Sequence, residues 1–574
     1  MVFGLRRRTV LAVGIAALAV ALVTVLLTAP EARSSVRSLL PSASPASAPA
    51  ARTAAPLALP VKPNIMVVML DDMRSDELRF APNARRYVRD RGVDFRNSFS
   101  PYPLCCPARA SFLLGKYAHN HHVLYHEAPY GFGSLDDHLT IAGRLQDAGY
   151  QTAMVGKYLN KYGDQPSKVT GRSSEHYVPA GWTDWMAGLE TRWRPGSGLS
   201  GNTYDYFNFT QNINGRTVQH RGQYSSTVIG DEVRGLITKY HRNGAPFFLW
   251  VTPVAPHHGA PYESDDPGSY RESNGRLQKF VTPARPAWVK GRFDKVITHA
   301  PGQPVHGPAE ADMRDKPRFM RHAVETTPYE KRALRTAERQ RAESIFAWDK
   351  EFGKIVARLK ATGEYDSTVI VFTSDNGFYI GEHRLRLGKI KPYEPVIHVP
   401  LLVAGPGISP GVRYSPVITP DLTPTILQLA GAADLPATDS ASKVATIFGP
   451  DQDWTVPVVT EGLLKEVRRV KGSGVPAGLT TSGLRTGRYK LIMYADREAQ
   501  LYDLQTDPNE LSSVWRRPAY RKIRTELVAL WARYRACKEA ACQVPLPDDL
   551  VTTPQWLATQ SAHAERAKVA YYDR

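Results

Sequence analysis

The sequence predicts an α/β protein whose mostly parallel sheet is sandwiched between helices. Several short apolar runs are rich in β-branched and aromatic residues and end abruptly in polar residues. They alternate with longer amphipathic segments such as residues 343–363. Strands that are apolar throughout are typical of a sheet covered on both faces, and intervening helical segments are typical of parallel connections.

Four of these runs bring polar residues to the point where a strand ends. We expect the strands at about residues 64–70, 150–156, 247–254 and 367–374. Ligands of open α/β sheets bind just beyond the carboxyl ends of the strands, so the residues that follow should lie together. These residues are Asp71, Asp72, Lys157, His257, Asp375 and Asn376.

The residue types at the four strand ends are complementary. Any one of them alone would be read as an ordinary polar turn. Together, the acidic and amide side chains offer hard oxygen ligands that suit Ca²⁺ or Mg²⁺, His257 offers proton transfer, and Lys157 offers positive charge. No Cys/His spacing indicates structural zinc. The combination predicts a metal-assisted site that handles an anion.

The four cysteines of the chain form two pairs with different expectations. Cys537 and Cys542 are close enough in sequence to form a disulfide across a short loop, as an oxidising compartment would allow. Cys105 and Cys106 are neighbours, and a bridge between adjacent residues would need a strained peptide. The second pair therefore calls for a chemical explanation.

The segment after Cys105 predicts a short helix. Pro107 suits the first turn of a helix, and Gly115 is placed to end it. Cys105 would then lie at a helix N-terminus, with Arg109 one turn further on. Unpaired N–H groups and the helix dipole favour a negative group at such a place.

The N-terminal 60 residues predict an exported protein. In residues 1–30, three arginines precede a long apolar run, which is expected to be a signal peptide or a membrane anchor. Residues 31–60 are mostly Ser, Ala and Pro and should form a disordered spacer. The protein is expected to be secreted or attached to the outer face of the cell membrane, and the composition of the leader suggests a bacterium.

Beyond the leader, we expect two domains and a basic surface. Residues 61–445 should form the large α/β domain and residues 446–574 a smaller α+β domain, with an antiparallel sheet and a helix. The net charge of the whole chain is +18, and residues 1–60 contribute +5 of it, which leaves +13 for the rest. This surplus favours acidic partners such as sulfated polymers, although a merely solvated basic surface explains it as well. No nucleic-acid-binding motif is present, so no nucleic-acid partner is expected.

Six motifs in order resemble the sulfatase family of the alkaline phosphatase superfamily. The signature is Cys-x-Pro-x-Arg from Cys105, continued by Leu113 and Gly115. The early Asp-Asp pair, "GKY" at 156–158, "APHH" at 255–258, "TSDNG" at 373–377 and the segment 388–407 agree in order. The signature region and the final Cys-x4-Cys are most similar to the branch of N-acetylglucosamine-6-sulfatases and heparan endosulfatases. The resemblance implies an alkaline phosphatase-like fold.

The resemblance also implies a modified nucleophile and one cation. A formylglycine-generating enzyme would convert Cys105 to 3-oxoalanine (formylglycine), whose hydrate attacks sulfur and then releases sulfate. The ligands of a Ca²⁺ ion, with Mg²⁺ as an alternative, would be Asp71, Asp72, Cys105, Asp375 and Asn376.

Further roles follow from the same resemblance. Arg109, Lys157 and Lys389 would surround the sulfate oxygens, and His257 would protonate the departing alcohol with help from Lys389. His119 and His383 are candidates for supporting or substrate contacts, and each is equally well explained as structural.

The chain departs from the family pattern at a few positions. Many sulfatases have a histidine two residues after the lysine of the "GK" motif, where this chain has Leu159. The signature holds Cys106, Ala108 and Leu114 where Ser or Thr is usual. These differences bear on proton transfer and on recognition by the modifying enzyme.

The sequence therefore predicts a hydrolase of sulfate esters, with alternatives left open. A sulfated saccharide with a 6-O-sulfated amino sugar is favoured as substrate, and an aryl sulfate is an alternative. Residues 171–223 and 261–328 are expected to form pocket walls. A phosphonate or phosphodiester hydrolase of the same superfamily is a second reading. A non-catalytic polyanion-binding protein with unmodified Cys105 is a third.

Overall fold

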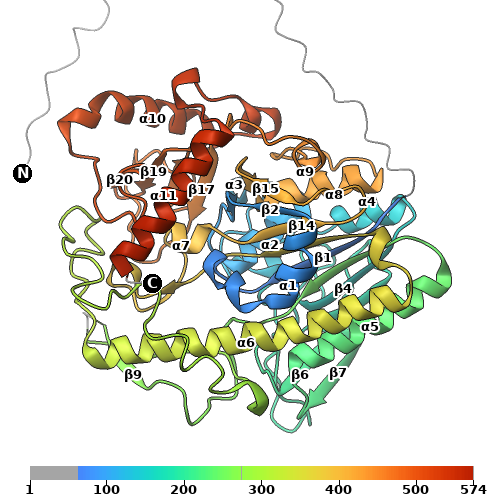
Figure 1. Ribbon diagram of the computed structural model, residues 1–574. Helices are drawn as coiled ribbons and strands as arrows, with labels where there is room; N and C mark the ends of the chain where they lie inside the picture. The colour runs from blue at the N-terminus through green and yellow to red at the C-terminus, as the bar shows by residue number, and fades with distance from the viewer. Residues whose placement is uncertain (1–61, 273–274, 573–574) are drawn as a thin grey trace, which may run out of the picture. The chain divides into compact units, whose positions relative to one another are not determined.

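A computed structural model describes residues 62–272 and 275–572 of the chain (Figure 1). These residues belong to a single compact unit. The predicted leader and spacer, residues 1–60, lie outside the described residues. Within the described part of the chain, no helix is both long enough and apolar enough to cross a membrane.

A ten-stranded mixed sheet forms the centre of the large domain. Its strands, in spatial order, are β15 (Gly411–Arg413), β2 (Val93–Phe95), β14 (Leu401–Ala404), β11 (Thr368–Ser374), β1 (Asn64–Leu70), β8 (Phe247–Thr252), β4 (Gln151–Lys157), β5 (Asp184–Gly188), β6 (Asn208–Ile213) and β7 (Arg216–Arg221). The five strands from β11 to β5 are mutually parallel. This confirms the predicted α/β class with a largely parallel sheet.

Most of the outer strands run antiparallel to their neighbours, whereas the edge strand β15 pairs parallel with β2. On one side β14 pairs antiparallel with β11, and on the other β5, β6 and β7 pair antiparallel in turn. β6 and β7 are joined by Asn214 and Gly215, which both have positive φ. Such a two-residue turn suits a hairpin, and an Asn-Gly pair in the sequence is the signal for it.

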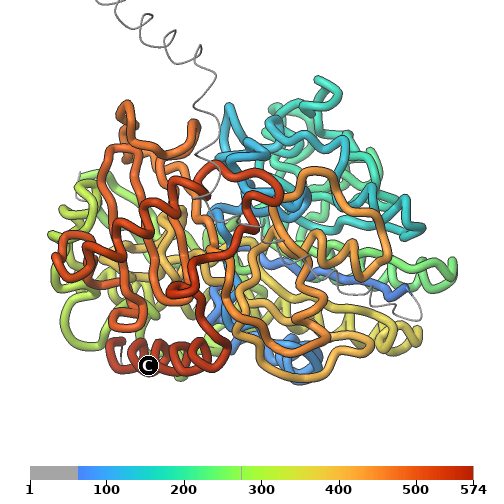
Figure 2. The backbone as a smooth tube through the Cα atoms, turned by 90° about the horizontal axis from the view of Figure 1, so that it is seen from above, coloured from blue at the N-terminus to red at the C-terminus, as the bar shows by residue number. Residues whose placement is uncertain are grey.

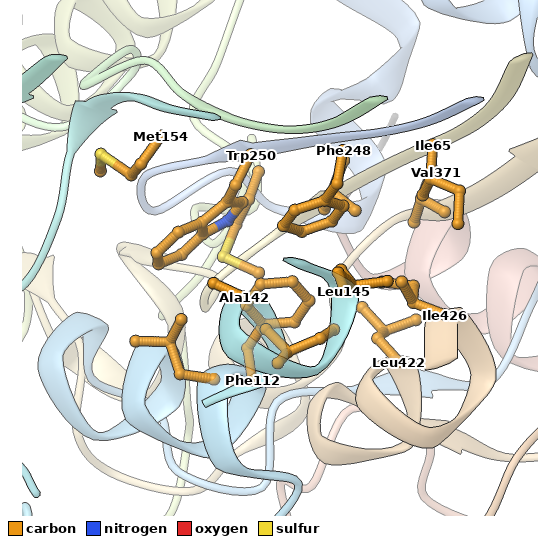
Figure 3. Packing of buried hydrophobic residues seen from close by; sticks show 14 of the residues in the cluster. Ile65, Phe112, Ala142, Leu145, Met154, Phe248, Trp250, Val371, Leu422 and Ile426 are labelled. Atoms are coloured by element: carbon orange, nitrogen blue, oxygen red, sulfur yellow. The ribbon is translucent and has the colours of Figure 1, made fainter. Parts of the chain in front are cut away.

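Both faces of the central part of the sheet are buried, which explains why the central strands are apolar throughout. In β1, Ile65, Val67 and Met69 belong to the core on one face, whereas Met66, Val68 and Leu70 belong to the core on the other. Figure 3 shows the first core, where side chains of the sheet meet Phe112, Leu145 and Ile426.

Helices cover the two faces unequally. The core of Figure 3 is closed by α2 (Cys105–Leu114), α4 (Ile141–Asp147) and α8 (Leu422–Ala430). The opposite core is closed by α1 (Pro82–Tyr87), α5 (Ser225–Asn243) and the 34-residue α6 (Pro328–Ala361), which lies alongside α5 in Figure 1. α6 starts with a capping box, in which Thr327 and Glu330 satisfy each other's backbone N–H groups.

The smaller C-terminal domain has the predicted antiparallel sheet and helix. Its four strands are β17 (Val458–Gly462), β18 (Thr481–Arg485), β19 (Tyr489–Tyr494) and β20 (Ala499–Asp503), and α10 (Arg521–Tyr534) and α11 (Pro554–Tyr572) follow. Figure 2 shows these orange-to-red segments gathered on one side. They share a core with Phe99 and Tyr117 of the large domain. The predicted boundary at residue 445 falls inside α9 (Val444–Phe448).

The remaining elements are short. They are β3 (Ser98–Phe99), α3 (Ala118–His121), β9 (Ser269–Arg271), β10 (Leu277–Lys279), β12 (Tyr379–Ile380), β13 (Leu387–Gly388), α7 (Glu394–Ile397) and β16 (Val417–Ile418).

Candidate active site

The carboxyl ends of β1 and β11 meet because the two strands pair in register up to Leu70 and Ser374. Asp72 follows with a φ of +70°, and its backbone N–H donates to Asp375 Oδ1 at 3.1 Å. Asn376 Nδ2 donates to Asp72 Oδ1 at 2.6 Å. Two predicted ligand pairs, 303 residues apart in the chain, are thereby held together.

The neighbouring strands β4 and β8 bring Lys157 and His257 to the same edge. Lys157 Nζ lies 2.6 Å from Asp71 Oδ2, and His257 Nε2 lies 3.7 Å from Asp72 Oδ2. His257 Nδ1 is 2.7 Å from the His258 carbonyl oxygen. Since a carbonyl only accepts, Nδ1 carries the proton, and Nε2 is the ring nitrogen turned toward the carboxylates.

Helix α2 begins at Cys105, as predicted, and supplies Cys105 and Arg109, whereas Lys389 directly follows β13 (Leu387–Gly388). It ends at Gly115, which adopts the left-handed conformation. Lys389 Nζ donates to Cys105 Sγ at 2.8 Å and to Asp72 Oδ1 at 2.5 Å. Arg109 Nε donates to Asp375 Oδ2 at 2.7 Å. Cys105 and Arg109 thus both face the carboxylates at the end of the sheet.

The acceptors at this edge fit a hard cation. Asp71 Oδ1, Asp72 Oδ2 and Asn376 Oδ1 are buried and have no hydrogen-bond partner among residues 62–272 and 275–572. Buried oxygens without partners are costly, and oxygen ligands of this kind suit Ca²⁺ or Mg²⁺. Ligand atoms of Asp71, Asp72, Cys105 and His257 all lie within 4.8 Å of one another. The residues present therefore fit the predicted ion.

Burial and the surrounding charges shift the pKa values of Asp71 and Asp375 in opposite directions. Burial raises the pKa of Asp71, but the charges of Lys157, Arg109 and Lys389 outweigh it and hold that pKa well below its usual range. Burial and the charge of Asp71 raise the pKa of Asp375 to about 6, although Arg109 opposes them. The site therefore concentrates negative charge on Asp71.

Burial also dominates the pKa shifts of the candidate nucleophile, Cys105, and of the candidate proton donor, His257. It raises the pKa of the Cys105 thiol to about 12, despite the nearby charges of Lys157 and Lys389. A thiol with this pKa is a poor nucleophile at neutral pH. Burial lowers the pKa of His257 to about 4, although Asp71 and Asp72 act in the opposite sense. His257 is therefore neutral before an anion enters the site.

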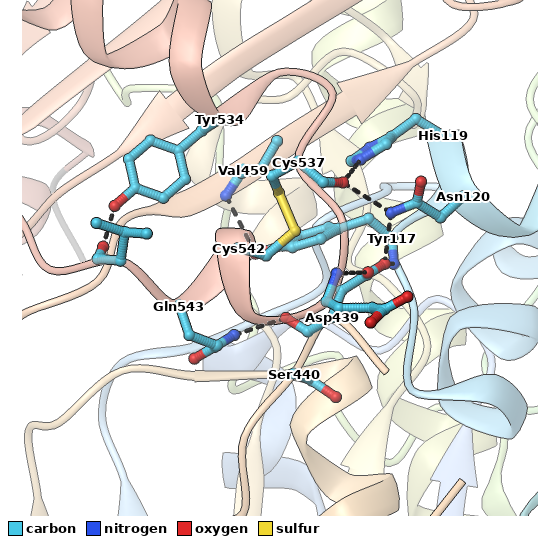
Figure 4. The surroundings of a disulfide bond; sticks show 12 residues. Tyr117, His119, Asn120, Asp439, Ser440, Val459, Tyr534, Cys537, Cys542 and Gln543 are labelled. Atoms are coloured by element: carbon cyan, nitrogen blue, oxygen red, sulfur yellow. Dashed lines mark hydrogen bonds between the residues drawn. A yellow bond between two sulfur atoms is a disulfide. The ribbon is translucent and has the colours of Figure 1, made fainter. Parts of the chain in front are cut away.

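The two histidines predicted as supporting contacts are engaged elsewhere. His119 Nδ1 lies 2.6 Å from Glu461 Oε1, and His119 Nε2 lies 2.7 Å from the Cys537 carbonyl oxygen. Figure 4 shows this histidine beside the disulfide between Cys537 and Cys542. Both ring nitrogens of His119 thus join the large domain to the C-terminal domain.

His383 belongs to a buried ionic cluster. Its Nδ1 lies 2.8 Å from Glu310 Oε2, and Lys316 Nζ lies 2.5 Å from Glu310 Oε1. Lys316 in turn donates to the backbone carbonyl oxygens of Glu510 and Leu511 in the C-terminal domain. These contacts give His383 a part in joining segments of the fold.

Two residues at the site were not identified from the sequence. Arg341 of α6 donates to the Asp72 carbonyl oxygen at 2.6 Å and pairs with Glu77. A signal existed, since Arg341 interrupts the apolar face of an amphipathic helix. Tyr204 lies with its ring beside Lys157 and His257. It falls in a segment expected to form a pocket wall, but nothing in the sequence singles it out from its aromatic neighbours.

Carboxylates, cations and a cysteine meeting at the carboxyl edge of a largely parallel sheet define an ester-hydrolase site for an anionic group. The family model described as Sulfatase matches residues 63–432. A second model, N-sulphoglucosamine sulphohydrolase, C-terminal, matches residues 471–536. The chain belongs to the sulfatase family, near the branch of N-acetylglucosamine-6-sulfatases, and is a sulfuric ester hydrolase.

Curated relatives match more than half of the chain. An arylsulfatase of Volvox carteri is 29% identical over 84% of this chain and 76% of its own length. The N-acetylglucosamine-6-sulfatase of Capra hircus is 31% identical over 64% of this chain and 60% of its own length. The second match thus leaves about two fifths of the caprine enzyme unmatched.

Solved structures share the fold at lower identity. One, described as a complex with its substrate D-glucosamine-2-N,6-O-disulfate, has a TM-score of 0.61 and 20% identity and covers 82% of this chain and 97% of its own. A phosphonate monoester hydrolase from Silicibacter pomeroyi has a TM-score of 0.58 and 21% identity, covering 86% of this chain and 99% of its own. These likenesses confirm the alkaline phosphatase-like fold.

Proposed function

We propose that this sulfatase removes sulfate from a sulfated saccharide, with a 6-O-sulfated amino sugar favoured, by means of formylglycine at position 105 and one Ca²⁺ ion. The observation that carries the proposal is the placement of Cys105 at the start of α2. There its Sγ accepts from Lys389 at 2.8 Å and lies in one cluster with Asp71 and Asp72. An unmodified thiol at this place is held neutral by burial.

The modified residue and the cation would supply chemistry that the thiol cannot. Formylglycine would provide a hydrated aldehyde as nucleophile, and Ca²⁺, held by oxygens of Asp71, Asp72, Asp375 and Asn376 together with residue 105, would polarise it. Mg²⁺ suits the same oxygen ligands. A formylglycine-generating enzyme would be needed for maturation.

The chain's own cations would bind and orient the sulfate group. Lys157 is buried and Lys389 is half-buried against carboxylates, so an entering sulfate ester could exchange with those partners at little cost in desolvation. Arg109 is anchored through Nε to Asp375, whereas its second terminal nitrogen, NH2, has no hydrogen-bond partner among the described residues. The guanidinium is thus fixed with one donor to spare for a sulfate oxygen.

His257 is oriented to handle the proton of the leaving alcohol. Its Nδ1–H is bound to the His258 carbonyl, which leaves Nε2 for proton exchange at the site. Entry of a sulfate dianion or ester would raise the pKa of this imidazole, since a nearby negative charge favours the charged form. Lys389, within 2.8 Å of Cys105 Sγ, would assist.

The preference for an amino sugar rests on the relatives. The caprine and human relatives are named N-acetylglucosamine-6-sulfatases, and a Drosophila relative is named an extracellular sulfatase homologue. We infer in addition that the protein is exported through residues 1–30 and acts outside the cytoplasm, with membrane anchoring by the same segment as an alternative to cleavage. The N-terminal charge pattern supports this.

A panel of substrates tests the proposal. Purified protein shown to carry the aldehyde should release sulfate from glucosamine 6-sulfate saccharides faster than from 2-O- or 4-O-sulfated ones, and EDTA should abolish release until Ca²⁺ is restored.

Release from an aryl sulfate alone would favour the second candidate, an arylsulfatase, which the algal relative supports by matching 84% of the chain. Tight binding of sulfated saccharides without turnover of any ester would contradict both and favour a polyanion-binding protein. Turnover of phosphonate monoesters or phosphodiesters in preference would indicate the other hydrolase of the superfamily.

A further inference from the structure

Tyr204 lies between two of the groups that serve the sulfate site. Lys157 Nζ is 5.0 Å from the centroid of the Tyr204 ring, and the His257 ring centroid is 4.8 Å from it. The Tyr204 hydroxyl accepts from Asn160 Nδ2 at 2.6 Å. One half-buried ring therefore contacts both the cation and the imidazole at the strand ends.

The segment around Tyr204 is hydrogen-bonded to the turn that carries His257. Ala260 N–H donates to the Tyr204 carbonyl at 2.8 Å, and Tyr206 N–H donates to the Ala260 carbonyl at 2.8 Å. Tyr206 also donates its hydroxyl proton to the His257 carbonyl at 2.7 Å. Three hydrogen bonds thus tie the turn to the segment of Tyr204.

The backbone at Gly259 packs closely against Tyr204 and Tyr206. A Cβ built on Gly259 would lie 2.2 Å from the Tyr204 carbonyl oxygen and 2.9 Å from the Tyr206 ring. Real Cβ atoms do not approach a backbone oxygen so closely, so only glycine fits. The position of the Tyr204 ring relative to His257 is therefore set by backbone contacts.

We propose that Tyr204 is a positioning residue, whose aromatic face holds the Lys157 ammonium and the His257 imidazole in the arrangement that receives the sulfate group. A cation is attracted to the face of an aromatic ring, and the same ring limits rotation of the imidazole packed against it. The inference rests on the proposed function, because it gives Lys157 and His257 roles at the sulfate. The roles of Lys157 and His257 do not by themselves require an aromatic ring at position 204, and this requirement is what the inference adds.

The ring and the hydroxyl can be separated by substitution. Tyr204→Phe keeps the ring and should retain kcat/KM for an aryl sulfate within about threefold, because the hydroxyl bonds to Asn160 and Glu190, which are not among the candidate site residues. Tyr204→Leu removes the ring and should lower kcat/KM by about 10- to 100-fold, as expected for misplaced catalytic groups. It should also weaken the binding of inorganic sulfate measured by calorimetry, a readout that needs no turnover.

Tyr365→Leu is the matched control. Tyr365 is also half-buried, with Lys360 Nζ 4.7 Å from its ring centroid and its hydroxyl 3.0 Å from the Tyr87 carbonyl, but it lies at the start of β11, the opposite end of that strand from the site. This variant should lose comparable packing and leave kcat, KM and sulfate binding unchanged. Equal kinetics and equal sulfate affinity in Tyr204→Leu and Tyr365→Leu would overturn the inference.

Two further measurements test the role of Tyr204 if the leucine variant does not fold or if the wild type is inactive. If Tyr204→Leu does not fold, ring-fluorinated phenylalanines at position 204 keep the shape while weakening the attraction to a cation. kcat/KM and sulfate affinity should then fall stepwise with fluorination, and unchanged values would overturn the inference. If aldehyde-bearing wild-type protein turns over no sulfate ester, the proposed function fails. The sulfate affinities of wild type and the Tyr204 variants would still test the positioning role of Tyr204.

Discussion

Gly156 precedes Lys157 at the end of β4, and its φ is +112°. A Cβ there would lie 2.2 Å from the Thr252 carbonyl oxygen of β8. Gly156→Ala should therefore both strain the backbone and push the two strands apart just where Lys157 leaves the sheet. We expect a loss of more than about 2 kcal/mol in the free energy of unfolding, measured with urea.

Gly149→Ala provides the comparison for this effect. Gly149 has a φ of +87°, but a Cβ there would meet no atom within 4 Å. Its loss should be limited to the backbone cost, about 1 kcal/mol. Equal losses in the two variants would show that the approach of β8 does not require a glycine at position 156.

The residues predicted from sequence were those whose local context carries the information. Cys105 was placed at a helix start because Pro107 and Gly115 mark the two ends of that helix. Contacts such as His119 to Glu461 join residues 342 positions apart. No local pattern specifies such a pairing, so the engagement of His119 in the fold had to be seen in the structure.

At the scale of elements, His119 should make the contact of α3 with β17 depend on pH. Burial lowers the pKa of His119, but Glu461 and the Cys537 carbonyl outweigh it and raise that pKa to about 9. The folded-state pKa thus exceeds the ordinary value of about 6.5. The stabilisation is complete below about pH 6.5 and is lost as the pH rises through 9, with a maximum of about 3 kcal/mol.

Unfolding of wild type and His119→Asn between pH 6 and 10 measures this contribution. The difference in free energy of unfolding should shrink over that range. His138→Asn is the control, because the exposed His138 pairs only with the exposed Asp136. A wild-type minus His119→Asn difference that does not change with pH would show that the pair with Glu461 does not titrate as described.

The disulfide should stabilise the same junction. The bond between Cys537 and Cys542 closes a loop with a sequence separation of 5, and the Cys537 carbonyl accepts from both His119 and Asn120. Replacing both cysteines with alanine should cost about 2 kcal/mol from chain entropy. Thermal unfolding of the double variant under oxidising conditions checks this, and an unchanged melting temperature would contradict it.

For the elements, the sequence predicted the central strands better than the edges. The strands from β11 to β4 are apolar on both faces, which is the pattern of a covered parallel sheet. β6 and β7 are polar and partly exposed, so their burial gives no comparable pattern. Their antiparallel direction follows from the short turn at Asn214 and Gly215. The Asn-Gly pair in the sequence is the local signal for this hairpin.

At the scale of the whole molecule, cation binding should stabilise the fold, because the predicted ligands come from β1, β11 and α2. Free Ca²⁺ at 100 times its Kd should add about 2.7 kcal/mol and raise the melting temperature of metal-free protein by about 2 °C. Asp72→Asn should remove most of this shift. Asp90→Asn, at an exposed carboxylate paired with Arg89, should keep it. An equal Ca²⁺ shift in Asp72→Asn and wild type would exclude Asp72 as a ligand.

The two-domain arrangement follows from composition, but the way the domains join does not. Apolar strands and amphipathic helices indicated a large α/β unit and a smaller α+β unit. The junction relies on buried polar contacts, His119 with Glu461 and Lys316 with the backbone carbonyls of Glu510 and Leu511. Buried charges depend on exact partners brought together by the fold, which a single sequence does not reveal.

The central claim is that the Cys105 side chain acts as an aldehyde beside a cation. The direct test is the mass of the tryptic peptide 97–109, measured together with sulfate-ester turnover in preparations that differ in maturation. The account predicts a peptide lighter than the thiol form by about 18 Da, turnover proportional to the fraction of that form, none in Cys105→Ala and retained turnover in Cys106→Ala. Full turnover by protein whose position 105 is entirely thiol would contradict the account.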